Sequence, residues 1–212
     1  MGLDWNPGPK AKSGCEQEFR ELWQKLHAKL CWSRATKLRR FKEITVTAFE
    51  TLATPRVGFD SAATDWAREK AFPRRADKSL TEATFVEGMK GFYVLELLPP
   101  CDGLPRYSNG EPGGYVEPYA FRGQFLKDCT EIIGKELLDS AWNSRLPEET
   151  LQYGNALLER ANESAKAKGI DIAKCALPDD PDSIEFHIDV VAAAGRWCRF
   201  WGERGHWLDA YS

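Results

Sequence analysis

The sequence has 212 residues, of which 42% are hydrophobic and 29% are charged, and it carries a formal net charge of −3. A chain of this length can bury roughly 70% of its unfolded surface in one compact body. No apolar run approaches the roughly 20 residues that a membrane-spanning helix needs, and the first residues hold neither the basic cluster nor the apolar segment of a signal peptide. We therefore expect a cytoplasmic protein that does not enter a membrane.

Charge and cysteine content limit the chemistry further. Residues 1–54 carry ten basic and six acidic side chains, whereas residues 91–212 carry twelve basic and twenty acidic ones, and such a separation can steer a charged partner. The cysteines form no Cys-x-x-Cys pair, so we expect reduced thiols, no metal site and no cofactor. They are Cys15, Cys31, Cys101, Cys129, Cys175 and Cys198.

The chain begins with an extended arm that leads into a helix. Three proline and glycine residues within residues 3–12 predict the arm, and Leu3 and Trp5 can hold it in place. Ser13 and Glu16 then form a capping box, and apolar residues recur at three- and four-residue steps after it. This pattern predicts an amphipathic helix to about residue 30.

Residues 33–43 form a short basic segment that we predict to be helical, followed by a brief strand over residues 45–49. Leu38 and Phe41 can dock this helix while the basic side chains between 34 and 42 face water. The 34–42 segment is therefore the best candidate for a nucleic-acid contact. A solvated helix face is the favoured interpretation, because the net charge is negative and no known nucleic-acid-binding motif accompanies the segment.

Two helices are predicted in the next part of the chain. A helix capped near Asp60 ends before Pro73, because proline cannot continue a helix. A second capping box, Ser79 with Glu82, opens a shorter helix that runs to about residue 89.

Residues 92–98 (FYVLELL) are ambiguous. Their β-branched and aromatic content favours a strand, while their length and position also suit a continued helix. If they form a strand, residues 115–119 are the natural partner across the intervening loop, and the two would make a small β ribbon.

Residues 99–118 are the longest stretch without helical or strand periodicity. They hold five of the twelve prolines and four of the seventeen glycines. A loop of this length within a compact domain is usually functional or disordered, and its apolar anchors favour an ordered one. Its candidate binding residues are Asp102, Arg106, Tyr107, Asn109 and Tyr115.

Three longer helices are predicted after the loop, over residues 118–141, 147–169 and 183–202. The first carries a wide apolar stripe, and the last is strongly amphipathic. Arginine and tryptophan alternate near the end of the last helix (RWCRFWGERGHW), but helical geometry places them on different faces. We therefore expect the tryptophans to pack in the core rather than to stack on bases.

Three polar residues stand within the apolar stripes of these helices. Arg122 and Glu136 fall within the stripe of the 118–141 helix, and His187 falls within that of the last helix. Buried charges are costly unless they are paired, so these residues suggest a hypothesis in which His187, with Glu136, is a catalytic candidate and Arg122 holds an anion. The alternative is that Glu136 points outward and His187 binds a backbone carbonyl.

The predicted fold class is mainly α, with about six helices, long irregular connections and a possible small β ribbon. We predict one domain over residues 1–212, with two helical sub-bundles, 1–90 and 119–212, joined through the 91–118 loop as the alternative.

The predicted function is a non-enzymatic binding module that presents the 99–118 loop to a protein partner or to a second copy of itself. The first alternative is an enzyme that binds a small anionic molecule where the loop meets the 119–141 helix. The second alternative is nucleic-acid binding through residues 34–42.

Overall fold

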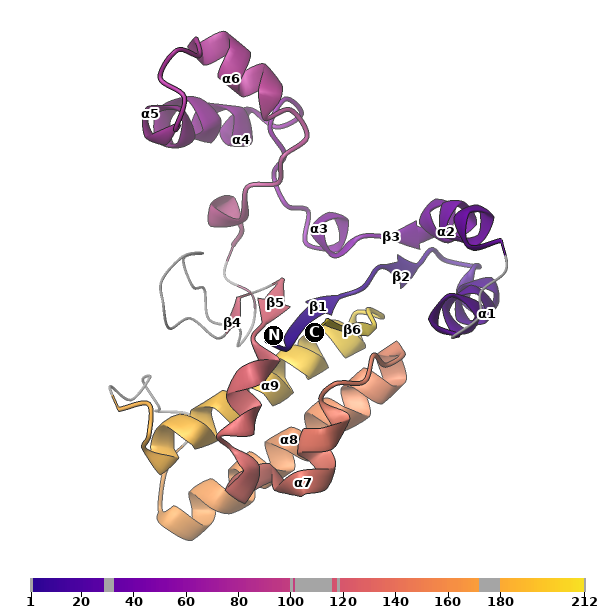
Figure 1. Cartoon of the computed structure of the whole chain (residues 1–212), viewed down its shortest axis with the longest axis vertical. Coiled ribbons are helices and arrows are strands. Elements are labelled where there is room, and N and C mark those ends of the chain that lie inside the picture. The colour runs from indigo at the N-terminus through magenta and orange to yellow at the C-terminus, as the bar shows by residue number, and fades with distance from the viewer. Residues whose placement is uncertain are drawn as a thin grey trace. The chain divides into compact units, whose positions relative to one another are not determined.

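A computed structural model of the chain confirms the predicted fold class: it is mainly helical, with small antiparallel sheets (Figure 1). The structure describes residues 2–28, 33–99, 101, 116–117, 119–171 and 180–211. Contacts divide the chain into a main unit, Met1–Ala48 with Asp102–Ser212, and a small unit, Phe49–Cys101. These boundaries differ from those of the two sub-bundles, and the arrangement as a single domain stays a prediction.

A four-stranded sheet joins the two ends of the chain in the main unit (Figure 1). Its strands are antiparallel and lie in the order β4–β5–β1–β6. The predicted arm is confirmed, because it supplies β1 and because Leu3 and Trp5 are both buried. Trp5 also donates its Nε1–H to the Ala141 carbonyl oxygen over 2.9 Å. The strands are β1 (Asp4–Pro7), β4 (Val116–Glu117), β5 (Ala120–Phe121) and β6 (Leu208–Tyr211).

A second ribbon of the main unit carries two of the predicted helices. Strand β2 (Lys10–Ala11) pairs with β3 (Thr45–Val46), and between them lie α1 (Glu16–His27) and α2 (Arg34–Glu43). The helices meet through a stacked aromatic pair, Phe19 and Phe41, whose ring centroids are 5.3 Å apart.

The predicted 118–141 helix is wrong in its first half. The chain forms β5, then the 3-10 helix η3 (Gly123–Lys127), and then α7 (Thr130–Ser140). Strand β5 pairs with β1 through Trp5 and Phe121, so tertiary pairing outweighs the helical periodicity of this segment. Gly134 adds an interruption within α7, with a φ of 73°.

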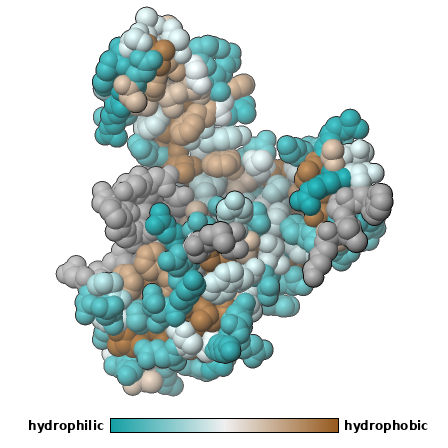
Figure 2. Space-filling view, in the orientation of Figure 1, coloured by the Kyte–Doolittle hydropathy of each residue, from teal (hydrophilic) through white to brown (hydrophobic). Residues whose placement is uncertain are grey.

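Two long helices of the main unit pack against each other, and both were predicted. They are α8 (Pro147–Lys168), which ends at Gly169 in the left-handed conformation, and α9 (Ile184–Glu203), whose first turn is capped by the Ser183 hydroxyl. The core face of α9 holds Trp197 and Trp201, which are fully buried as expected. Figure 2 shows hydrophilic residues over much of the visible face of the main unit, which agrees with helices that bury only one side.

Glycines allow α8 and α9 to approach each other closely. A Cβ atom on Gly154 would lie 2.7 Å from the Cβ of Cys198, and one on Gly195 would lie 2.8 Å from the Gly154 carbonyl oxygen. A Cβ on Gly202 would lie 2.9 Å from the backbone nitrogen of Leu151. These distances are shorter than real contacts allow, so the two backbones meet where side chains are missing.

The small unit is built from short helical segments around a core of Val57, Ala63, Ala67 and Val94. The predicted ribbon of 92–98 with 115–119 lies partly outside the described residues. Of those that are described, Tyr93 makes a bridge with Arg56, and Val116 pairs with Phe121. The segments are α4 (Ser61–Trp66), the π-helical η1 (Ala67–Ala71), α5 (Phe72–Arg74), α6 (Glu82–Gly88) and the 3-10 helix η2 (Leu95–Leu97), and α3 (Ala48–Thr51) stands at the boundary between the units.

His206 is buried where the chain turns back from α9 to β6. Its ring Nδ1 lies 2.8 Å from the Gly8 carbonyl oxygen, and its ring meets the edge of Trp201 at a centroid distance of 4.9 Å. Burial lowers the pKa of His206 to about 4, with a smaller contribution from the charges of Lys10 and Arg204. The imidazole is therefore neutral at physiological pH.

We predict that this histidine makes stability depend on pH in the acid range. The unfolded chain binds a proton on the imidazole near pH 6.5, whereas the folded chain does so only near pH 4. Above about pH 6.5, His206 should not reduce the free energy of unfolding. As the pH drops from there to about 4, the free energy of unfolding should fall by on the order of 2–3 kcal/mol. Urea titrations across this range measure the effect.

The variant His206→Asn keeps a donor for the Gly8 carbonyl and should lose most of this slope. His187→Asn, at a half-buried histidine of α9, is the matched control and should keep it. An identical slope in the wild type and in His206→Asn would contradict the assignment.

We also predict that Gly195→Ala separates α8 from α9. Its new methyl group would meet backbone as well as the Leu158 side chain, so the free energy of unfolding should drop by about 1–3 kcal/mol. Gly88→Ala is the control, because nothing lies within 4 Å of the added Cβ. Chemical denaturation of both variants tests the close contact between α8 and α9. Equal losses in the free energy of unfolding would argue against that contact.

Candidate functional site

Three arginines project from the part of α9 and of its C-terminal cap that does not pack in the core. Arg196, Arg199 and Arg204 stand at steps of three and five residues, and Phe200 and Glu203 lie between them in the sequence. The opposite face is held in the core by buried tryptophan and small apolar residues. Because that face is fixed, the arginines must project from the other side of the helix.

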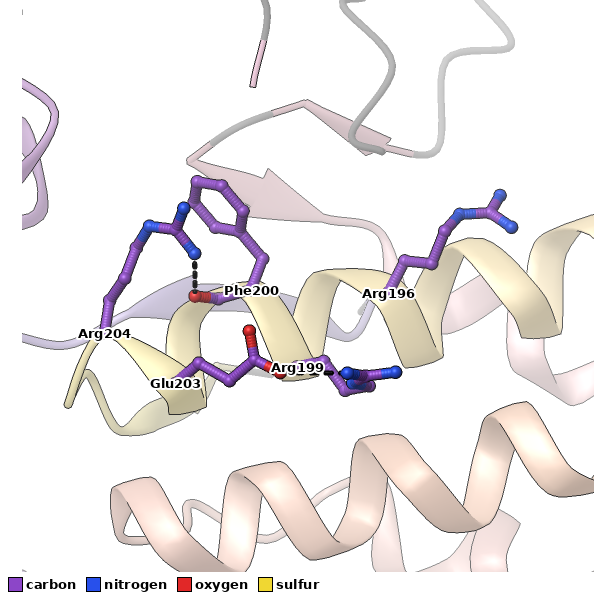
Figure 3. A pocket seen from close by; sticks show the side chains of 5 residues that line it. All are labelled: Arg196, Arg199, Phe200, Glu203 and Arg204. Atoms are coloured by element: carbon purple, nitrogen blue, oxygen red, sulfur yellow. Dashed lines mark hydrogen bonds and ion pairs between the residues drawn. The ribbon is translucent and has the colours of Figure 1, made fainter. Parts of the chain in front are cut away.

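These five residues line a pocket of about 240 Å3 (Figure 3). In this view Arg199 and Glu203 lie on the side of α9 that faces α8, while Arg196 and Arg204 extend on the other side of the helix. The lining therefore presents three guanidinium groups and one carboxylate, an excess of positive charge. We call it the arginine pocket.

Each guanidinium is held by a neighbour. Arg199 Nη2 lies 3.0 Å from the Glu203 carboxylate, and Arg204 donates to the Phe200 carbonyl oxygen over 3.0 Å while its guanidinium stacks 3.6 Å over the Phe200 ring. Arg196 lies 3.6 Å from the buried Asp189 carboxylate. These contacts orient the side chains without enclosing them, because Arg199 and Glu203 remain about half exposed, at 49% and 47%.

This arrangement is suited to holding an anion. A guanidinium offers several N–H donors in a planar fork that fits carboxylate and phosphate oxygens, and it stays charged at any physiological pH. Bonds between ionised partners are about twice as strong as neutral ones. The one acid in the lining, Glu203, already engages Arg199 and shows how a carboxylate sits there.

A second pocket, of about 520 Å3, adjoins the first along α8. Arg199 lines both pockets, so the two share a wall. The other lining residues all lie on one face of α8: Asn155, Leu158, Glu159, Asn162, Glu163 and Lys166. We call it the α8 groove.

The predicted loop residues cannot be placed in this geometry. Asp102, Arg106, Tyr107, Asn109 and Tyr115 lie outside the residues that the structure describes.

The three polar residues expected within apolar stripes are described. Arg122 is exposed between β5 and η3, Glu136 is exposed on α7, and His187 is half-buried in the first turn of α9. Among described residues, no hydrogen bond or ion pair joins them. The His187 carbonyl oxygen accepts a weak bond from the Cys129 thiol at 3.6 Å, and the catalytic and anion-holding roles of this set stay a prediction.

The sequence contains a signal for the arginine pocket. Helical geometry separates the arginines of the last helix from its tryptophans, but this separation does not distinguish a binding site from a solvated face. Three arginines against one acid within nine residues is the relevant pattern. The shared wall with α8 depends on the glycine contacts between the helices, which periodicity does not reveal.

Two cysteines of the main unit, Cys129 and Cys198, are buried. Burial raises the pKa of the Cys129 thiol to about 12 and raises that of the Cys198 thiol as well, so neither forms a nucleophilic thiolate near neutral pH. Within the described ranges, no group of three or more histidine, cysteine, aspartate or glutamate side chains could hold a metal ion. None of the helices in those ranges is long and apolar enough to span a membrane.

Comparisons with protein-family models, with curated proteins and with solved structures found no match to this chain.

Proposed function

We propose that this chain is a binding protein whose main unit takes an anionic group in the arginine pocket. One observation carries the proposal: Arg196, Arg199 and Arg204 all line a single pocket whose lining contains one carboxylate. The excess charge and the planar donors favour a carboxylate or phosphate ligand. Residues 99–118 remain part of this proposal as a second binding element.

A binding function is supported better than a catalytic one by the groups in the pocket. Its lining supplies positive charge, hydrogen-bond donors and one carboxylate that is paired with Arg199. A general base or nucleophile needs a helper that activates it, whereas a binding site needs only donors in fixed positions. The pocket supplies such donors.

The basic helix α2 is supported less as a contact for nucleic acid. Arg40, near its centre, binds the Glu18 carboxylate at 2.7 Å and lies 3.3 Å from Glu43. The Arg40 guanidinium also lowers the pKa of Glu18, which keeps this pair charged. Part of the positive charge of α2 is therefore neutralised within the protein.

We predict that the protein binds inorganic pyrophosphate and that the variant Arg199→Gln weakens this binding about tenfold, equivalent to about 1.4 kcal/mol. The reason is that Arg199 is the guanidinium shared by both pockets. Isothermal titration calorimetry at low ionic strength measures the dissociation constant.

Arg39→Gln is the matched control, since it removes the same charge from an exposed position on α2. It should leave pyrophosphate binding within about twofold of the wild type. If the wild type shows no pyrophosphate binding, or if Arg39→Gln and Arg199→Gln weaken it equally, the arginine pocket is not the site.

A further inference from the structure

The small unit exposes two aromatic rings on one pair of hydrogen-bonded segments, residues 55–60 and 91–94. The Val57 N–H donates to the Phe92 carbonyl oxygen over 2.9 Å, and the Gly91 N–H donates to the Val57 carbonyl oxygen over 2.8 Å. We call these two segments the aromatic ribbon. Phe59 is 62% exposed and Phe92 is 53% exposed, and among the described residues of the small unit no other large hydrophobic side chain is exposed.

Hydrogen bonds hold Phe59 in this exposed position. The Phe59 and Asp60 N–H groups donate to the Arg56 carbonyl oxygen over 3.1 and 2.9 Å, and the Arg56 N–H donates to the Asp60 carboxylate over 2.7 Å. The Arg56 guanidinium stacks 3.7 Å over the Phe59 ring. The ring is therefore fixed before a partner arrives, which lowers the entropic cost of binding.

The core of the small unit leaves both rings uncovered. Its buried residues are Val57, Ala63, Ala67 and Val94, which all have small side chains. Aromatic residues and arginine are the residue types that protein interfaces contain more often than the rest of a protein surface does. The aromatic ribbon therefore has the composition of a contact with another protein molecule.

The charges of the small unit indicate which molecule the ribbon contacts. Residues 49–101 contain seven basic and eight acidic side chains, a net charge of −1, so the unit attracts neither a polyanion nor a polycation at long range. Arg56 and Asp60 precede and follow Phe59 in one turn, and in the described part of the chain neither forms an ion pair with another side chain. An unpaired base and an unpaired acid on one turn can pair twice across a two-fold axis, because each then meets its opposite on the other copy.

We propose that the aromatic ribbon is a two-fold contact between two copies of this chain. Phe59 and Phe92 of one copy pack against those of the second copy, and Arg56 of each copy pairs with Asp60 of the other. The contact uses no residue of the arginine pocket, so it is independent of the proposed anion binding.

The dimer should be weak. Two aromatic side chains bury at most about 500 Å2, which is less than the roughly 800 Å2 per partner of a standard interface. We expect a dissociation constant of about 10–100 µM.

Sedimentation velocity of the full chain at about 1–300 µM tests the dimer. The wild type should shift from a monomer of 24.0 kDa towards twice that mass as its concentration rises. The double variant Phe59→Ser with Phe92→Ser removes both exposed rings and should weaken association at least about tenfold. A wild type that stays monomeric throughout, or a double variant that associates as the wild type does, would overturn the inference.

Leu38→Ser with Tyr211→Ser is the matched control, because these side chains of the main unit are also exposed, at 38% and 70%. It should associate within about twofold of the wild type. An equal loss of association in both double variants would assign the contact to general surface hydrophobicity and contradict the role of the ribbon.

A charge exchange tests the pairing of Arg56 with Asp60. Arg56→Glu alone or Asp60→Arg alone places like charges opposite each other in the dimer and should weaken association about tenfold or more. An equimolar mixture of the two variants restores both opposite-charge contacts and should associate within about threefold of the wild type.

Circular dichroism checks that each charge variant folds, because Asp60 also holds the turn. No recovery in a mixture of two folded variants would exclude the two-fold pairing. If Asp60→Arg does not fold, the serine double variant decides on its own whether the ribbon is the contact.

Discussion

The close approach of α8 to α9 is the constraint on which the main unit depends. Gly154 and Gly195 remove the side chains that would keep the two backbones apart, and Gly202 does the same nearer the end of α9. Dispersion and burial then act over most of the length of both helices, and the core face of α9 becomes almost fully enclosed. The same contact determines where Arg199 emerges, because its backbone nitrogen would lie 3.0 Å from a Cβ on Gly154. Packing inside the unit thus decides which charged group stands at the edge of both pockets.

The sequence predicted the elements for which a single local pattern, such as helical periodicity, determines the structure. Amphipathic periodicity and end signals predicted α8 and α9, including the stop at Gly169, and Leu3 and Trp5 followed by proline and glycine predicted the arm. The prediction for residues 118–141 was wrong because these residues satisfy two patterns. Their spacing suits a helix, but Phe121 pairs with Trp5 of the arm, 116 residues earlier in the chain. Pairing at such a distance is invisible to periodicity, and it outweighs a local preference of a few tenths of a kcal/mol per residue.

The candidate site was harder to predict than the fold, for a physical reason. The sequence places Arg196 and Arg199 on a polar helix face, but most polar faces are only solvated surface. The shared pocket requires Arg204, beyond the last turn, to fold back on Phe200, and the α8 groove requires α8 to lie beside Arg199. Both are tertiary facts. His187 became a candidate because it is a polar residue within an apolar stripe. A side chain at the margin of a buried face gives the same pattern, and His187 is half-buried.

Some ionisable groups of the main unit are buried and hold its interior together, whereas others are exposed on α9. Burial raises the pKa of the Tyr153 hydroxyl and of the Cys198 thiol and lowers that of the Arg145 guanidinium, so these groups are committed to the interior. Arg145 donates to the Asn143 carbonyl oxygen at 2.7 Å and to the Ser140 hydroxyl at 2.7 Å, and it stacks 4.0 Å over the Tyr153 ring, which ties the end of α7 to the start of α8. The contacts of Arg196, Arg199 and Arg204 described above are with residues of α9 itself, so they do not connect two elements as Arg145 does. The ion pair between Arg199 and Glu203 is about half exposed and contributes about 0–1 kcal/mol to stability, so a ligand can replace it at small cost to the fold.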